Sequence, residues 1–201
     1  MKQLLLDIKP AAPASLQNFL AGRNAEALAS LTAAVHPSAS SNFIYLWGEA
    51  GSGKSHLLTA CAAHNLTVVD DVHLLSSAAQ IDLFNRYNQL KENHGTLITA
   101  GRHAPTQMGL RDDLATRLAW GLVYQLHPLN DAEKSQALQK HAAERGMRLP
   151  NEVVDYCLRY LRRDLSTLMA TLDALDEWSL TTKKPITLPL LRQLLQLNLA
   201  L

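Results

Sequence analysis

The chain has 201 residues and a formal net charge of +1 at pH 7, with 47% hydrophobic and 18% charged residues. This length can bury a sizeable core in one domain, or in one domain with a smaller appendage. The small net charge gives no general attraction to nucleic acid or to a membrane surface, and no apolar run approaches the length of a membrane span. The two cysteines lack metal-ligand spacing, which favours a reduced, cytoplasmic setting.

Residues 1–14 are predicted to form a tail and linker, because a short apolar string at residues 3–8 is followed by Pro10, two alanines and Pro13. From residue 15 to residue 35, apolar positions recur at helical spacing, with an interruption at Gly22 and Asn24. This pattern predicts a short helical turn, a loop and then a helix.

The next stretch carries the strongest chemical signal. The apolar run 43–47 predicts a buried strand, and it leads directly into a complete G-x-x-x-x-G-K-[ST] phosphate loop made of Gly48, Glu49, Ala50, Gly51, Ser52, Gly53, Lys54 and Ser55. The glycines allow backbone N–H groups to point at phosphate oxygens, and the helix expected over 54–64 adds the positive end of its dipole. Lys54 would reach the β- and γ-phosphates and Ser55 would ligate Mg²⁺.

A second strand, residues 66–69, ends in Asp70 and Asp71, as in a Walker B motif. Asp70 is the candidate Mg²⁺ ligand, and Asp71 would orient or deprotonate the attacking water. A strand followed by a helix cap explains the same residues, but beside a complete phosphate loop the metal site is favoured.

The rest of the chain predicts two more strands and then only helices. A helix over 79–92 precedes a strand over 96–100, and a helix over 113–120 carrying Arg117 precedes a strand over 122–126. Helices are predicted over 132–145 (capped by Asp131), 152–161 (capped by Asn151), 164–180 and 189–199. An α/β region over 15–128, followed by a helical lid over 129–201, is the expected organisation.

This arrangement resembles an AAA+ ATPase module. Its local sequence is similar to that of the DnaA family, most of all to the shorter regulatory Hda type. The segments that carry the resemblance are Gly53-Lys54-Ser55-His56-Leu57-Leu58, the Asp-Asp pair, Thr116-Arg117-Leu118-Ala119-Trp120-Gly121 and Leu126-His127-Pro128-Leu129. DnaA continues into a helix-turn-helix domain whereas this chain stops, so we expect no direct sequence-specific binding to DNA.

The resemblance assigns roles to single residues. Arg117 falls on the arginine finger, which would reach in trans to a neighbour's γ-phosphate, and Arg163 falls on the lid residue that contacts phosphate. Phe19 and Leu20 fall where the family folds its N-terminal segment against adenine, and His56 adjoins the phosphate loop. A solvated helix surface is the less favoured explanation for Arg117, but without the family it explains Arg163 as well as the lid contact does. Core packing explains Phe19 and Leu20 equally well.

Two departures from the family pattern matter. The span between Lys54 and Asp70 is too short for one strand of the family, which predicts a shortened parallel sheet of order 5-1-4-3 with the Walker B strand at its edge. We therefore expect a homodimer or higher oligomer, or a covering segment, at that edge. The family also carries Asp where this chain has Gly101, with Thr99 and Arg102 as nearby polar groups, so intrinsic ATP hydrolysis should be weak or absent.

The N-terminal string is similar to the peptide by which Hda-type proteins bind the DNA polymerase sliding clamp. Gln3 would fix the polar register, and Leu4, Leu6 and Ile8 would be the apolar anchors. As a bare hexapeptide it better suits the start of a strand or helix, but its position in a tail of an Hda-like chain favours the clamp-binding peptide.

The resemblance implies a negative regulator of DNA replication initiation. It would hold ADP or ATP, with ADP as the expected form, together with Mg²⁺. It would also bind the sliding clamp and stimulate hydrolysis of ATP bound to DnaA. The alternatives are a self-contained P-loop ATPase of the helicase-loader type and an adaptor whose nucleotide has no catalytic role.

Overall fold

A computed structural model of the chain describes residues 13–36, 43–161 and 164–199. The chain divides into two compact units, the first covering residues 13–128 and the second containing the residues from Leu129 onward. The elements of the first unit are η1 (Gly22–Asn24), α1 (Ala25–Ala34), β1 (Phe43–Trp47), α2 (Lys54–Ala62), β2 (Thr67–Val69), η2 (Val72–Leu74), α3 (Ser77–Glu92), β3 (Leu97–Gly101), η3 (Pro105–Gln107), α4 (Asp112–Ala119) and β4 (Leu122–Gln125).

The first unit is built on a four-stranded sheet of order β2-β3-β1-β4 in which every pairing is parallel. This is the 5-1-4-3 order predicted for a shortened AAA+ sheet, with the Walker B strand at one edge, so the predicted fold class is confirmed. The central strand β1 is apolar on both faces because both faces are covered by helices.

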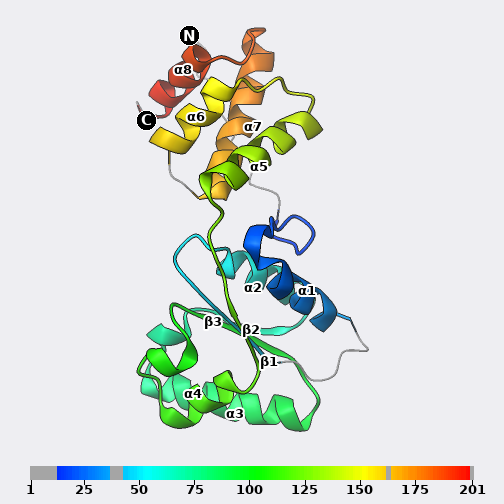
Figure 1. Cartoon of the computed structure of the whole chain (residues 1–201), viewed down its shortest axis with the longest axis vertical. Coiled ribbons are helices and arrows are strands. Elements are labelled where there is room, and N and C mark those ends of the chain that lie inside the picture. Colours follow the sequence, from blue (N-terminus) through cyan, green and yellow to red (C-terminus); the bar gives the residue numbers. More distant parts are fainter. Residues whose placement is uncertain (1–12, 37–42, 162–163, 200–201) are drawn as a thin grey trace. The chain divides into compact units, whose positions relative to one another are not determined.

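Helices cover both faces of this sheet. Figure 1 shows α1 and α2 on one face and α3 and α4 on the other. Successive residues of β1 point to opposite faces, so Ile44 and Leu46 join the core under α1 and α2, whereas Tyr45 joins the core under α3 and α4. The carboxyl ends of all four strands therefore open onto one edge, which is where ligands bind in open parallel sheets.

The short edge strand β2 is half-buried rather than open. Leu66 and Val68 pack against the core under α1 and α2, and Val69 packs against the core under α3 and α4. The length of three residues keeps the pairing edge that we expected to need a partner short. The homodimer stays a prediction.

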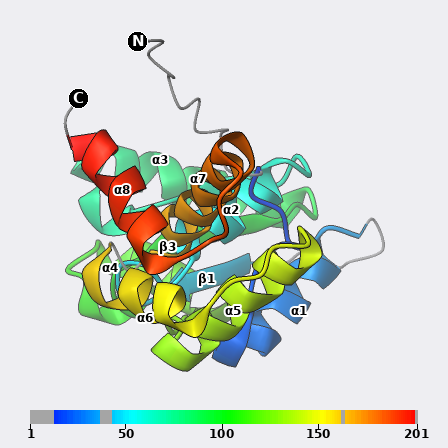
Figure 2. The same cartoon turned by 90° about the horizontal axis from the view of Figure 1, so that it is seen from above.

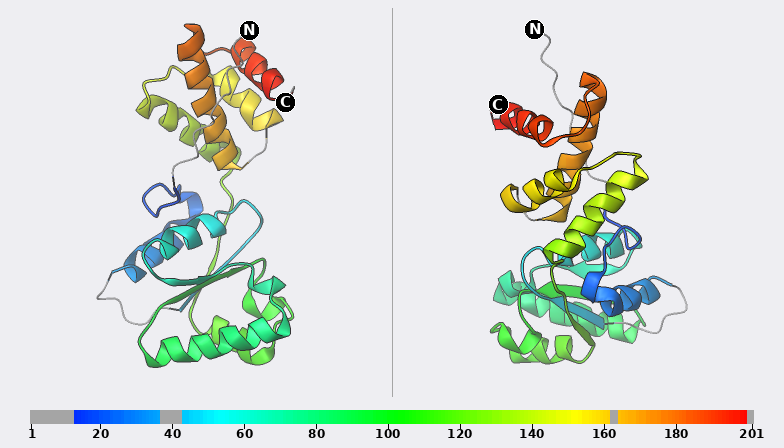
Figure 3. Two further views of the ribbon diagram at one scale, coloured as in Figure 1. Left: turned by 180° about the vertical axis from the view of Figure 1, so that it is seen from behind. Right: turned by 45° about the horizontal axis from the view of Figure 1, so that its top comes forward.

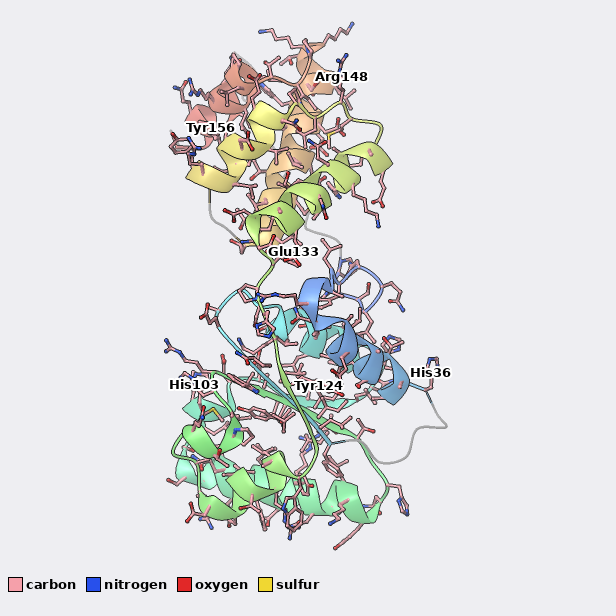
Figure 4. All side chains as sticks on the ribbon, viewed as in Figure 1. His36, His103, Tyr124, Glu133, Arg148 and Tyr156 are labelled. Atoms are coloured by element: carbon pink, nitrogen blue, oxygen red, sulfur yellow. The ribbon has the colours of Figure 1, made fainter. Side chains whose placement is uncertain are left out.

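Asn24 joins the N-terminal segment to the end of the sheet region. Its side chain is only 4% exposed, and it donates from Nδ2 to the carbonyl of His127 (2.8 Å) and accepts at Oδ1 from the N–H of His127 (2.8 Å). Ser30 on α1 adds a hydroxyl contact to Tyr124 on β4 (2.7 Å; Tyr124 is labelled in Figure 4). These contacts pair polar groups that burial would otherwise leave unsatisfied.

The second unit is a bundle of four helices around its own apolar core. The helices are shown from above in Figure 2 and from two further directions in Figure 3: α5 (Asp131–Glu144), α6 (Asn151–Tyr160), α7 (Leu165–Thr182) and α8 (Leu188–Leu199). Leu138, Val153, Leu168 and Leu172 are fully buried in that core. A network on the bundle surface joins α5 to α7, where Asp173 is hydrogen-bonded to His141 (2.7 Å) and forms an ion pair with Arg145 (3.3 Å).

The helix caps of this unit differ in part from those predicted. Asn130, not Asp131, caps α5, and it forms a reciprocal capping box with Glu133. Asn151 does not cap α6 but is its first residue, following Pro150, and its side-chain oxygen accepts from Gln139 (3.0 Å). Asp164 caps α7 as predicted.

Cys61 and Cys157 are buried free thiols in the two different units. Burial raises the pKa of each thiol to about 11, because the thiolate would be poorly solvated. In the described part of the chain, no helix is long and apolar enough to cross a bilayer.

The Asn24→Ala substitution should loosen strand β4. It leaves the buried N–H and C=O of His127 without partners, at a cost of about 2 kcal/mol. Amide hydrogen exchange of peptides covering β4 should therefore speed up by roughly 10- to 30-fold. The matched control is Asn85→Ala, at an exposed position of α3, which should leave the β4 peptides unchanged; equal exchange in both variants would contradict the structural role of Asn24.

Candidate functional site: a phosphate-binding cleft

The loop between β1 and α2 has the backbone shape that a phosphate cradle requires. Gly51 and Gly53 adopt positive φ angles of 79° and 95°, which favour glycine over other residues. At Gly53 a side chain is excluded as well, because a Cβ would lie 2.6 Å from the ring of Phe19. The first turn of α2, starting at Lys54, follows at once and directs its free N–H groups toward the loop.

Lys54 lies beneath this loop. Its Nζ donates to the carbonyls of Gly48 (2.7 Å) and Glu49 (2.9 Å), so the ammonium group is anchored to the loop. Burial lowers the pKa of Lys54, and the negative charges of Asp70 and Asp71 oppose that shift. A partly desolvated ammonium group is suited to bind a polyphosphate. The N–H groups that donate to the two carbonyls would donate more strongly to phosphate oxygens, because these carry a negative charge.

Ser55 and Asp70 come together as the two motifs predict. The Ser55 hydroxyl donates to Asp70 Oδ2 (2.7 Å), and Asp70 Oδ1 accepts from the N–H of Asp71 (2.8 Å). One hydroxyl and one carboxylate are hard oxygen ligands, which suits Mg²⁺ when phosphate oxygens and water complete its octahedron. The described residues contain no group of three His, Cys, Asp or Glu side chains that would hold a metal ion by themselves. The pair thus fits a magnesium ion that arrives with a nucleotide.

Asp71 follows in a left-handed backbone conformation, with φ of 47°. Its carboxylate lines the cleft, and its Oδ1 lies 3.9 Å from Nδ1 of His73, which is too far for a hydrogen bond. The turn thus directs one carboxylate of the pair to Ser55 and the other to the cleft.

A cleft of about 980 Å³ lies over the loop, large enough for a nucleotide. Predicted residues that line it are Gly48, Glu49, Ala50, Gly51, Gly53, Lys54, Ser55, His56 and Asp71. Ser52 is buried beneath the loop, and Asp70 reaches the site through Ser55. Arg102, which the sequence analysis named as a polar group near Gly101, also lines the cleft. Sequence reasoning missed the other four lining residues, which are Trp47, His73, His103 and Gln125.

The N-terminal segment is attached to the start of α2. His56 contacts the carbonyl of Ser15 through Nε2 (3.0 Å), and the ring of Phe19 lies 5.5 Å from the His56 ring. Phe19 also covers Gly53, so it adjoins the loop where an adenine contact is predicted. Leu20 is half-buried in the same segment but does not line the cleft.

Arg117 is located elsewhere on the first unit, on α4. Its guanidinium lies 4.6 Å from the ring centroid of Trp120, 5.8 Å from that of Phe84 and 6.0 Å from that of Tyr87. Three cation–π contacts hold the group at a surface where Trp120 is 63% exposed. Arg117 is not among the residues that line the phosphate cleft.

The other predicted site residues lie outside the described residues. These are Gln3, Leu4, Leu6 and Ile8, predicted for the clamp, and Arg163, predicted for the lid. Their roles stay predictions.

Comparison with known proteins agrees with this arrangement. Residues 131–195 match the family model described as Hda, lid domain. The fold is similar to that of domain III of the replication initiation protein DnaA of Thermotoga maritima, with a TM-score of 0.71 and 22% identity over 94% of this chain and 98% of that one. It is also similar to AMPPCP-bound DnaA of Aquifex aeolicus, with a TM-score of 0.68 and 22% identity over 84% of this chain and 66% of that one. A third similar structure is the RuvB Holliday junction branch migration motor of Thermotoga maritima, with a TM-score of 0.67 and 17% identity over 92% of this chain and 72% of that one. The predicted resemblance is confirmed: an Hda-like lid follows a core with the fold of DnaA domain III.

The Lys54→Ala substitution should abolish most nucleotide binding by the cleft. Losing a partly desolvated, charge-assisted contact to phosphate costs about 1.5–3 kcal/mol, or roughly 10- to 150-fold in affinity. Titration of the full chain with a fluorescent ADP analogue measures the change. Lys184→Ala, at an exposed position of the second unit, is the control; equal affinities for both variants would exclude Lys54 from the binding site.

Proposed function

We propose that this protein is a nucleotide-bound negative regulator of DNA replication initiation that stimulates hydrolysis of ATP held by DnaA. The nucleotide, ADP with Mg²⁺, occupies the cleft over Gly48–Ser55, and the sliding clamp binds the N-terminal tail. The observation that carries the proposal is the separation of two features within the first unit. A complete phosphate cleft occupies one location, and an arginine that does not line it is displayed at another.

The placement of Arg117 suits action on a partner. A guanidinium resting on the exposed Trp120 ring is fixed in direction and remains accessible to a phosphate of another molecule. An arginine finger supplied in trans stabilises the charge that develops on the transferred phosphoryl group, and is worth about 10³- to 10⁵-fold in rate in other systems. The Hda-like lid and the DnaA-like core supply the reason to name DnaA as the molecule whose ATP is hydrolysed.

The bound nucleotide would have a structural role in this proposal. Gly101 ends β3 without a side chain, so the strand end offers no carboxylate or amide to position an attacking water. Hydrolysis in the protein's own cleft should be slow for that reason, and ADP would remain bound through the phosphate loop.

A second candidate is a self-contained ATPase. The hydrogen-bonded Ser55–Asp70 pair and the cleft-lining Asp71 form a complete metal and water-activating set, as such an enzyme needs. It predicts substantial ATP turnover by the chain alone, and the regulator predicts turnover only when DnaA is present.

Substituting Arg117→Ala should remove the stimulation of DnaA-bound ATP hydrolysis. The expected loss is at least about 100-fold in the stimulated rate, since the finger is the only catalytic group the partner would receive. The assay contains DnaA loaded with ATP, the sliding clamp, DNA and this chain. Arg86→Ala, at an exposed position of α3 without a partner in the described part of the chain, should stimulate as the unmodified chain does.

ADP binding by the variant and ATP turnover without DnaA are measured as well. Arg117→Ala should still bind ADP, because the residue does not line the cleft. Full stimulation by this variant would overturn the proposed role and favour the adaptor, and undiminished turnover by this chain without DnaA would favour the self-contained ATPase.

The double substitution Leu4→Ala and Leu6→Ala should weaken binding to the sliding clamp. Each apolar anchor removed from a pocket costs about 1.5–3 kcal/mol, so the affinity should fall by more than about 100-fold. Surface plasmon resonance with immobilised clamp measures it, and Lys2→Ala, outside the anchor pattern, is the control. Unchanged affinity would place the clamp contact elsewhere, or nowhere, on this chain.

A further inference from the structure

The side-chain amide of Gln80, in the first turn of α3, joins two segments that lie apart in the sequence. Its Nε2 donates to the carbonyl of Leu75 (3.0 Å), and its Oε1 accepts from the N–H of Arg111 (2.9 Å). A backbone carbonyl can only accept and an N–H can only donate, so the two partners determine which end of the amide is the oxygen. The half-buried side chain is therefore held in one orientation from both ends.

The first of these segments is the turn that follows the Asp70–Asp71 pair. Asp71 lines the phosphate cleft, and η2 and then Leu75 follow it in the chain. Val72, the first residue of η2, is fully buried in the core under α3 and α4. The turn is thus anchored in the core, and its carbonyl at Leu75 gives the amide of Gln80 a fixed base.

The second segment is the start of α4, the helix that carries Arg117. Arg111 precedes α4 and provides no side-chain cap, and the first helical bond runs from the N–H of Ala115 to the carbonyl of Arg111 (2.9 Å). The N–H of the same Arg111 is bound by Gln80, so a side chain of α3 sets the point at which α4 begins. The Arg111 guanidinium is occupied by Asp113 (2.9 Å).

Helix α3 also supports α4 further along, at Arg117 itself. Phe84 and Tyr87 lie four and seven residues after Gln80, which places all three side chains on one face of α3. The Arg117 guanidinium lies 5.8 Å from the ring centroid of Phe84 and 6.0 Å from that of Tyr87. Since Arg117 comes six residues after Arg111, about 9 Å of α4 separate the two supports. Figure 1 shows the two helices on the same face of the sheet.

We propose that Gln80 is a positioning residue for Arg117, because it fixes the start of α4 against α3 through the N–H of Arg111. Gln80 itself contacts no phosphate. The inference rests on the proposed function, in which Arg117 acts on ATP held by a partner. A guanidinium that must meet a phosphate of another molecule depends on the path of its helix, since a misplacement of about 1 Å can cost about 100-fold in rate.

Two substitutions separate the hydrogen bonds of Gln80 from its size. Gln80→Met keeps the length of the side chain and removes both bonds. The maximum stimulated rate of hydrolysis of DnaA-bound ATP should fall by about 10-fold, while the concentration of this chain that gives half of that maximum should change by less than about 2-fold. Gln80→Glu keeps an acceptor for the N–H of Arg111 and should lose less than Gln80→Met. Equal losses for the two variants would contradict the proposed role.

The matched control is Gln89→Met, at an exposed position of the same helix, which should stimulate as the unmodified chain does. Adding Gln80→Met to Arg117→Ala should lower the rate no further, because both changes act through one guanidinium. Binding of ADP, followed by calorimetry, should stay within about 2-fold for Gln80→Met. A further loss in the double variant, or weakened ADP binding, would show that Gln80 supports the first unit in general and not Arg117.

A spectroscopic measurement follows the position of Arg117 without any activity. Its guanidinium lies 4.6 Å from the ring centroid of Trp120, so 5-fluorotryptophan at Trp120 reports on that group by ¹⁹F NMR. The chain has three tryptophans, and the resonance that is missing from Trp120→Phe is that of Trp120. Gln80→Met should shift this resonance and leave the others in place, and Gln89→Met should shift none.

The two measurements separate the inference from the proposed function. If the unmodified chain fails to stimulate hydrolysis but Gln80→Met shifts the Trp120 resonance, the proposed function fails and the placement of Arg117 by Gln80 stands. If the unmodified chain stimulates hydrolysis and Gln80→Met changes neither the rate nor the resonance, or only one of them, the inference is overturned while the function stands.

Discussion

The parallel pairing of β1 with β3 on one side and β4 on the other is the constraint on which the site depends. It encloses β1 at both edges while helices enclose both of its faces, so the residue after Trp47 must leave the sheet at a fixed point. Leu126 donates its N–H to the carbonyl of Trp47 (2.6 Å), and Gly48 is packed so closely on the Leu126 carbonyl that a Cβ would overlap it. The phosphate loop is therefore held at its base by the neighbouring strand end, and only its upper part is free to adapt to a ligand.

The second constraint is that the strand ends and helix α4 present different groups at different locations. The ends of β1, β3 and β2 provide the loop, Arg102 and the carboxylate pair, and α4 presents Arg117 at a location that does not line the cleft. In the proposed function, this division would let a nucleotide occupy the cleft while Arg117 remains available to a different molecule. The aromatic rings under Arg117 reduce the number of conformers the side chain must lose on contact with a phosphate, which favours binding through preorganisation.

Local patterns made the sheet order and the phosphate loop predictable from the sequence. The loop and the Asp70–Asp71 pair are contiguous motifs next to apolar strands, and the short span between Lys54 and Asp70 left room for only one strand. Asn24 and Gln80 were not predictable in this way, since they bind His127 and Arg111, which lie 103 and 31 residues away. Asn24 broke a helical pattern and Gln80 fitted a polar position of a predicted helix, so neither indicated a role. The cap of α5 was wrong by one residue because Asn130 and Asp131 are both good capping residues, and only the backbone path decides between them.

The burial of both cysteines has a practical consequence. Neither native sulfur competes for thiol-specific reagents at neutral pH, because each is enclosed in a core and holds its proton there. A single cysteine introduced on an exposed position of either unit would therefore be the one fast-reacting thiol of the chain. Pairs of such positions, one per unit, would carry spectroscopic probes that report the distance between the two units with each nucleotide, without removing either native residue.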